Sequence, residues 1–355
     1  MRILITGGAG FIGSNVALHL RRTCRDARIV CMDNLYRRGS ELNVPRLQEG
    51  GVQFHRGDIT DANGFPSGPF DFILECSAEP SVLAGKTDSP DYVFRTNLVG
   101  AYQCLEKARR WDSNFLFLST SRVYPIAVLE AHPWREEKTR FVWEEGHGKD
   151  GISSRGVSEK TGLTGARSLY GFTKLAAEQL IEEYRAAYDM KAAVNRCSVI
   201  AGPWQFGKID QGVAALWVLA HHFGYPLSYI GYGGAGKQVR DILHVDDLCE
   251  LISDQINNFS QWDGWLGNVS AGLPNAISLC ELTALCREIS GKEIPISSVA
   301  TNRPNDVRIL ILDGSRLFER TTWRPKRDLH CIIQDISNWV GDHADALKHL
   351  LPNRT

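Results

Sequence analysis

Short apolar runs alternate with longer amphipathic segments through the first 200 residues. The runs have the length of buried strands, whereas residues 90–110 and 170–185 carry apolar positions at helical spacing. Strands that alternate with helices form parallel sheets with right-handed crossovers. We therefore predict an α/β fold with a doubly wound parallel sheet, whose strands lie at residues 3–5, 29–32, 52–54, 70–74, 115–118 and 194–200.

The pattern changes after residue 200. Glycine-rich stretches cover residues 202–212 and 231–236, and short elements then alternate irregularly. We predict a nucleotide-binding domain at residues 1–200, to which 237–265 return, and a smaller, partly interleaved substrate-binding domain at 201–236 and 266–355. Periodicity is also lost over residues 125–167, which either border the active site or form a solvated surface loop.

The first apolar run leads directly into a glycine turn. Gly7, Gly10 and Gly13 follow residues 3–5. Glycines at this spacing let the backbone approach a pyrophosphate, and the N-terminus of the following helix attracts its charge. Glycines in turns often serve only the turn, but a strand before them and an acid about twenty residues later are typical of a dinucleotide site. The pattern predicts a Rossmann-type domain.

Asp33 is the expected acid, because it follows the second apolar run. Its carboxylate would accept hydrogen bonds from the adenosine ribose and repel a 2′-phosphate, which favours NAD over NADP. Arg37 and Arg38 lie close by in the sequence and act against this preference.

Composition narrows the choice of partner and compartment. The 355 residues include 40 basic and 41 acidic side chains, so no basic excess points to nucleic acid or an anionic membrane surface. We expect no membrane segment and no signal peptide, because long apolar runs are absent and Met1 nearly adjoins the first strand. Nine cysteines without metal-ligand spacing predict reduced thiols, no metal site and a cytoplasmic protein.

Tyr170 and Lys174 lie four residues apart, on one face of a predicted helix. A tyrosine titrates near pH 10 on its own, and a lysine ammonium and a bound nicotinamide cation would lower its pKa. Tyr170 is then a plausible general base for an alcohol, and Thr120 at a strand end could hold the substrate oxygen. The Tyr-x-x-x-Lys spacing is common in helices, so its value depends on the dinucleotide motif upstream.

Together these motifs resemble the extended short-chain dehydrogenase/reductases, in the branch of NAD-dependent nucleotide-sugar epimerases and dehydratases. The matching segments extend over nearly the whole chain. They are residues 7–13, 33–35, 57–59, 96–100, 119–120, 123–124, 170–174, 240–247, 303–306 and 323–325.

The resemblance implies a role for each matching residue. The implied catalytic residues are Thr120, Tyr170 and Lys174, of which Lys174 also holds the ribose. The implied NAD-binding residues are Gly7, Gly10, Phe11, Ile12, Gly13, Asp33, Asn34, Asp58, Ile59, Asn97, Tyr170 and Lys174.

Residues 33–39, 210–212 and 236–241 further resemble the CDP-paratose 2-epimerase family, also called CDP-tyvelose 2-epimerases. This resemblance implies a CDP-sugar substrate, whose diphosphate oxygens suit paired guanidinium contacts. It also implies a homodimer or homotetramer that pairs the helices at 97–110 and 170–188. The implied substrate-binding residues are Thr120, Gln211, Gln238, Arg240 and Arg303.

The chain departs from the family pattern near the predicted cofactor. The usual His-Leu-Ala-Ala/Gly after the fourth strand is replaced by Glu75-Cys76-Ser77-Ala78, and Pro125 replaces a glycine. The dehydratases carry an acidic pair where this chain has Ser121 and Arg122. Without an acid to eliminate water, a 4,6-dehydratase is disfavoured.

Three functions follow from these observations. A redox-neutral epimerase would oxidise a sugar carbon transiently, with Tyr170 as base and tightly bound NAD, and return the hydride to the opposite face. A nucleotide-sugar dehydrogenase or reductase would use the same residues but release reduced cofactor in each cycle. A non-catalytic NAD-sensing protein is the third, against which the intact Thr120, Tyr170 and Lys174 argue.

Overall fold

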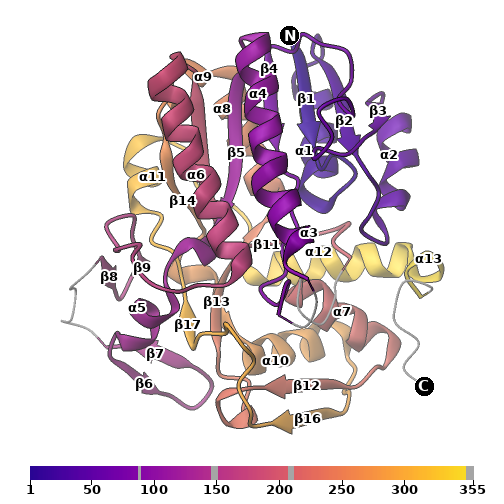
Figure 1. Cartoon of the computed structure of the whole chain (residues 1–355). Coiled ribbons are helices and arrows are strands. Elements are labelled where there is room, and N and C mark those ends of the chain that lie inside the picture. The colour runs from indigo at the N-terminus through magenta and orange to yellow at the C-terminus, as the bar shows by residue number, and fades with distance from the viewer. Residues whose placement is uncertain (87–88, 145–150, 207–211, 349–355) are drawn as a thin grey trace. The chain divides into compact units, whose positions relative to one another are not determined.

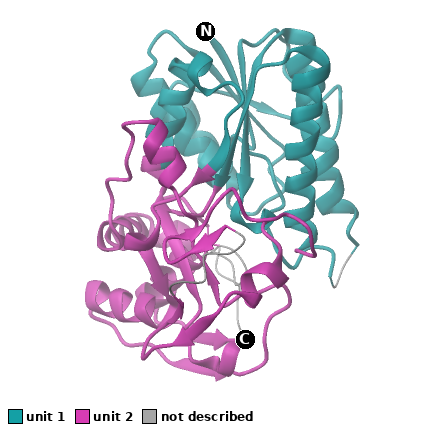
Figure 2. Ribbon diagram, turned by 90° about the vertical axis from the view of Figure 1, so that its left-hand side faces the viewer, with its two compact units in different colours: residues 1–123, 168–196, 248–267 teal, residues 124–167, 197–247, 268–355 magenta. Residues whose placement is uncertain are grey.

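The computed structural model describes residues 1–86, 89–144, 151–206 and 212–348 (Figure 1). The chain divides into two compact units, shown in Figure 2: unit 1 contains residues 1–123, 168–196 and 248–267, and unit 2 contains 124–167, 197–247 and 268–355. The division expected from the sequence placed 124–167 and 237–247 with the nucleotide-binding domain, whereas here both segments pack within unit 2.

Unit 1 is built on a seven-stranded sheet with the order β3-β2-β1-β4-β5-β10-β14. Its pairs β1–β2, β1–β4, β2–β3 and β4–β5 are parallel. The predicted doubly wound fold is confirmed, and chain order reverses between β1 and β4, where such sheets bind ligands. The strands are β1 (Arg2–Thr6), β2 (Arg28–Asp33), β3 (Gln53–Arg56), β4 (Phe72–Glu75), β5 (Asn114–Thr120), β10 (Ala192–Cys197) and β14 (Leu266–Val269).

Helices cover both faces of this sheet (Figure 2). Two of them, α4 and α6, lie side by side in Figure 1 and contact each other. The apolar runs form strands because both faces are covered: Ile3, Leu4 and Ile5 are fully buried. The helices are α1 (Phe11–Thr23), α2 (Asn43–Glu49), α3 (Asp91–Phe94), the π-helical segment η2 (Arg95–Val99), α4 (Gly100–Trp111), α6 (Leu169–Tyr188), α8 (Val245–Asn257), α9 (Phe259–Trp262) and the 3-10 turns η1 (Ser40–Leu42) and η3 (Ser121–Val123).

Unit 2 contains a small sheet centred on β13, which is parallel to β11 and β17 and antiparallel to β15. Helices α7, α10 and α12 share one hydrophobic core. The elements are β11 (Val199–Ala201), α7 (Val213–Phe223), β12 (Leu227–Ile230), η4 (Tyr232–Gly234), β13 (Val239–His244), η5 (Leu273–Asn275), β15 (Ala276–Ser278), α10 (Leu279–Ser290), β16 (Ile296–Val299), β17 (Ile309–Leu310), α11 (Ser315–Arg320), α12 (Leu329–Asp342) and α13 (Ala344–Lys348).

One sequence prediction about these elements was wrong. Residues 194–200 do not form one strand, because the chain passes from unit 1 to unit 2 there and β10 and β11 belong to different sheets. Of the two alternatives for residues 125–167, the solvated surface loop does not describe the segment, since Phe141 and Trp143 are buried. That segment contains α5 (Ile126–Ala131) and two hairpins, β6 (Trp134–Glu136) with β7 (Phe141–Trp143) and β8 (Ile152–Ser153) with β9 (Gly156–Val157).

Candidate active site

The glycine turn between β1 and α1 has the geometry that a dinucleotide requires. Gly7 has a φ of +62°, and a Cβ there would lie 2.8 Å from the backbone of Cys76. A Cβ on Gly13 would lie 2.4 Å from the Gly7 carbonyl oxygen, so α1 packs closely on the turn. No side chain of the described residues caps α1 at Gly10, which leaves its N-terminal N–H groups available to an anion. These residues fit the pyrophosphate of NAD.

Asp33 ends β2 beside this turn. Its carboxylate accepts hydrogen bonds from the N–H of Ala9 at 3.1 Å and from the N–H of Leu35 at 2.8 Å. Burial raises the pKa of Asp33, these backbone bonds oppose the rise, and the nearby Asp58 carboxylate adds to it. Asp33 is therefore hydrogen-bonded directly to the glycine turn through Ala9.

Asp58 and Ile59 follow β3 and have different environments. Asp58 accepts hydrogen bonds from Asn34 at 2.9 Å and from the N–H and hydroxyl of Thr60 at 2.8 Å each. Burial acts to raise the pKa of Asp58, but these hydrogen bonds outweigh it and the pKa is lowered. Ile59 is buried in the core, where a Cβ on Gly100 would lie 2.3 Å from its Cδ1 atom. Its side chain therefore serves packing.

Asn97 acts as a clamp inside the π-helical segment η2. Its Oδ1 accepts from the N–H of Glu79 at 2.8 Å, and its Nδ2 donates to the Glu79 carbonyl at 3.0 Å and to Thr173 Oγ1 at 3.1 Å. These bonds tie the loop after β4 to helix α6. Asn97 therefore positions α6 through its own amide group.

The three predicted catalytic residues all belong to unit 1. Thr120 ends β5, and its hydroxyl accepts a hydrogen bond from the N–H of Arg122 at 3.2 Å, so the same hydroxyl can still donate its proton. Tyr170 lies in the first turn of α6, which is capped by Ser168. The turn η3, which follows Thr120, packs against α6. The structure thus brings the strand end and the helix together.

Lys174 is buried one turn after Tyr170. Its Nζ lies 3.5 Å from Glu75 Oε2 and 4.0 Å from the centre of the Phe117 ring. Burial raises the pKa of Glu75, and Lys174 and Ser77 oppose that rise. Sequence reasoning missed this pair, although it noted Glu75 as a departure from the family pattern.

The predicted substrate-binding residues within the described chain belong to unit 2, apart from Thr120, and Gln211 lies outside the described residues. Arg240 pairs with Asp306 at 2.6 Å, and the N–H of Asp306 donates to the Arg303 carbonyl at 3.4 Å. The Gln238 Nε2 donates to the Ile230 carbonyl at 2.7 Å. The structure therefore pairs the Arg240 side chain with Asp306, an interaction that the sequence did not reveal, and joins Arg303 to Asp306 through a backbone hydrogen bond.

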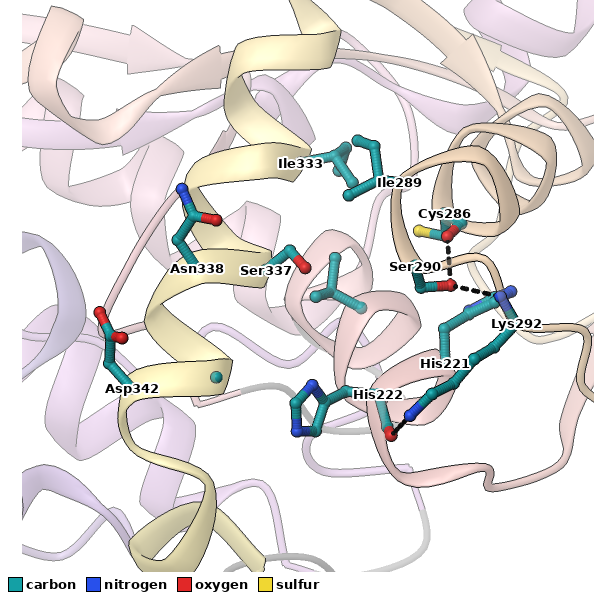
Figure 3. Close-up of a pocket in the computed structure, with 12 residues that line it drawn as sticks. His221, His222, Cys286, Ile289, Ser290, Lys292, Ile333, Ser337, Asn338 and Asp342 are labelled. Carbon is teal, nitrogen blue, oxygen red and sulfur yellow. Dashed lines mark hydrogen bonds between the residues drawn. The ribbon is translucent and has the colours of Figure 1, made fainter.

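A cavity of about 610 Å³ in unit 2 lies between α7, α10 and α12 (Figure 3). His221 lines it, and its Nδ1 lies 2.8 Å from the Trp217 carbonyl. Burial lowers the pKa of His221, so the ring is neutral near pH 7. Lys292 also lines the cavity and donates to the His222 carbonyl at 2.6 Å. The lining contains no described residue that the sequence placed in the active site, so we do not assign the reaction there.

Two kinds of site are absent from the described residues. They contain no group of three His, Cys, Asp or Glu side chains that could hold a metal ion. Within the same part of the chain, no helix combines the length and apolar character needed to cross a membrane.

Known proteins are similar to this chain in sequence and architecture. Residues 3–261 match the NAD dependent epimerase/dehydratase family. The CDP-paratose 2-epimerase of Salmonella typhi is 28% identical over 96% of this chain and 99% of its own length. A dTDP-glucose 4,6-dehydratase of Mycolicibacterium smegmatis is 27% identical over 96% and 93%. The crystal structure of a Thermus thermophilus UDP-glucose 4-epimerase in complex with NAD is 26% identical, with a TM-score of 0.74 and coverage of 96% and 99%.

Proposed function

The chain belongs to the NAD dependent epimerase/dehydratase family, and we propose that it is a nucleotide-sugar epimerase that inverts carbon 2 of a CDP-deoxyhexose. NAD is the cofactor of this family. In this proposal Gly7, Gly10 and Gly13 hold its pyrophosphate, and Asp33 accepts hydrogen bonds from its ribose.

One structural observation favours an epimerase over a dehydratase. The turn η3 directly after Thr120 consists of Ser121, Arg122 and Val123 and contains no carboxylate. A dehydratase needs an acid there to expel water, whereas an epimerase does not. The proposal that the substrate is a CDP-sugar is based on the full-length similarity to the Salmonella typhi CDP-paratose 2-epimerase.

The residues of the chain divide the work as follows. NAD, when bound, supplies a hydride acceptor and donor for the sugar carbon. Tyr170 takes the proton of the hydroxyl on that carbon and returns it to the product, with Lys174 supporting its ionised form. The Thr120 hydroxyl donates to the substrate oxygen. Arg240 and Arg303 bind the diphosphate. To do so, Arg240 exchanges its ion pair with Asp306 for the phosphate oxygens.

The test is turnover without added cofactor. Purified protein incubated with CDP-paratose should interconvert it with its 2-epimer, followed by NMR of the sugar protons, and denatured protein should release NAD. Tyr170→Phe should lower the rate by at least ~100-fold. Conversion that needs added NAD would contradict retained cofactor, and a keto-deoxy product from dTDP-glucose would favour a dehydratase.

We further propose a cytoplasmic homodimer or homotetramer formed through η2, α4 and α6. All nine cysteines are free thiols, as in a reducing compartment.

The proposed interface has exposed apolar side chains. Val99, Tyr102, Phe172 and Tyr188 are each at least 40% exposed on these neighbouring elements. Phe172→Asp should yield monomers by light scattering, whereas Leu273→Asp, which changes an exposed apolar residue of unit 2, should not.

A further inference from the structure

Glu75 is buried at the centre of the sheet in unit 1. It ends β4, where it is paired in register with Thr6 of β1 on one side and Phe117 of β5 on the other. Only 1% of the residue is exposed. A carboxylate in this position is expensive to bury unless a cation compensates its charge.

Lys174 supplies that cation. Its Nζ lies 3.5 Å from Glu75 Oε2 and above the Phe117 ring, and 2% of the residue is exposed. The two charges come from elements that are 99 residues apart in the sequence, β4 and α6. Any other group that binds the Lys174 ammonium therefore does so in the presence of the Glu75 carboxylate.

Two other described ionisable groups close to the pair along α4 and α6, Cys104 and Glu178, contribute little net charge. Cys104 on α4 faces both charges, and burial raises its pKa so that it stays a neutral thiol. Glu178 lies one turn further along α6, and its charge is matched by Arg196 on β10 at 2.6 Å. Among the described residues, Glu75 is thus the carboxylate that pairs with Lys174, and Tyr170 lies one turn before Lys174 on the same helix.

We propose that Glu75 is a positioning residue that holds Lys174 in place. Its negative charge partly cancels the positive charge that Lys174 presents to Tyr170. Tyr170 therefore becomes a base only at a higher pH than it would beside a lysine without a carboxylate partner. This inference rests on the proposed function, in which Tyr170 is the base. Removing an anion makes proton loss easier for the whole coupled pair of Tyr170 and Lys174.

The test is a titration of Tyr170 in the protein without substrate. Tyrosine labelled isotopically at Cζ reports ionisation by NMR, and the Tyr170→Phe variant identifies the resonance. Glu75→Gln keeps the size of the side chain and removes its charge, so Tyr170 should ionise roughly 1 pH unit lower. An unchanged or higher ionisation pH would overturn the inference, because a purely structural Glu75 would change stability alone.

Two further variants make this experiment decisive. Glu75→His introduces the residue usual in the family and serves as the test if Glu75→Gln folds poorly. It should shift the Tyr170 titration in the same direction. Glu182→Gln removes an exposed charge from the same helix and should leave the titration in place, since solvent screens that charge.

Activity gives a separate readout. The acidic limb of the kcat/KM profile with CDP-paratose should move to lower pH in Glu75→Gln by the same amount as the NMR titration. If the protein does not epimerise this sugar, the proposed function fails while the NMR titration still decides the role of Glu75. If the sugar turns over and the titration does not move, only the inference about Glu75 fails.

Discussion

Two successive turns of helix α6 each carry a buried ion pair, and the two pairs are bonded very differently. Glu178 accepts from Arg196 Nη2 at 2.6 Å and from Nε at 3.1 Å to each oxygen, and also from the Ser119 hydroxyl. Lys174 meets Glu75 through one contact of 3.5 Å. The saturated pair, Glu178–Arg196, in which several hydrogen bonds join the two side chains, fixes the helix against the sheet. The loose pair, Lys174–Glu75, has one long bond, which leaves the Lys174 ammonium able to bind a reacting group.

Breaking the saturated pair should produce the largest effect on stability. Glu178→Gln leaves the Arg196 guanidinium buried without its counter-ion, which should lower the free energy of unfolding by about 3–5 kcal/mol. Urea unfolding followed by circular dichroism measures this loss. A loss no greater than that of an exposed pair would contradict the distinction drawn between the two turns of α6.

A buried carboxylate held by neutral donors sharpens the comparison. Asp241 in β13 accepts from the Ser270 hydroxyl at 2.5 Å and from the N–H of Leu312 at 3.3 Å. Burial raises the pKa of Asp241 from 3.8 to about 6, so its protonated form is favoured in the folded state and stability falls as pH rises between these values.

The Asp241→Asn variant removes this dependence on pH. Relative to the variant, the wild-type protein should lose roughly 2–3 kcal/mol of unfolding free energy between pH 4 and pH 6. Urea unfolding at several pH values on both proteins measures the difference. Parallel pH profiles for the two proteins would show that Asp241 does not titrate in this range.

Breaking the loose pair should have a smaller effect on stability than breaking the saturated pair. Glu75→Gln also leaves a buried cation without its counter-ion, but it breaks a single contact of 3.5 Å, whereas Glu178→Gln breaks several shorter ones. The free energy of unfolding should therefore fall by only about 1–2 kcal/mol. The same urea titration as for Glu178→Gln gives a direct comparison. A loss equal to that of Glu178→Gln would mean that Glu75 also has a mainly structural role.

The smallest effect is expected at the exposed end of α6. Arg185 and Glu182 lie 3.4 Å apart, with half of the Glu182 side chain exposed to solvent. Glu182→Gln should change the free energy of unfolding by less than about 0.5 kcal/mol, because solvent screens this pair. A larger loss would indicate that position on the helix, and not burial, decides what an ion pair contributes.

The sequence was sufficient for features that depend on neighbours in the chain. The glycine turn, Asp33 and the Tyr170–Lys174 spacing are each local patterns, and β1, β2, β4 and β5 were found because they are largely apolar, whereas β14 was not predicted. The hairpins between residues 134 and 157 escaped detection, because strands of two or three residues are too short to show alternation.

Contacts between distant segments could not be inferred in this way. Glu75 stood out only as a departure from a family pattern, and nothing local links it to Lys174. The clamp of Asn97 on Glu79 and Thr173 and the pairing of Arg240 with Asp306 likewise depend on the tertiary fold. Each of these contacts involves a residue, Lys174, Asn97 or Arg240, that the sequence had already suggested as a site residue.

The interleaving of the two units has a consequence for synthesis on the ribosome. The edge strand β14 (Leu266–Val269) neighbours β10 (Ala192–Cys197), so β10 remains an open edge while some seventy intervening residues are translated. Exposed strand edges promote pairing between nascent chains. The protein should therefore depend on chaperones during translation more than a protein whose sheet is completed in one continuous stretch, and a fragment ending before β14 should aggregate.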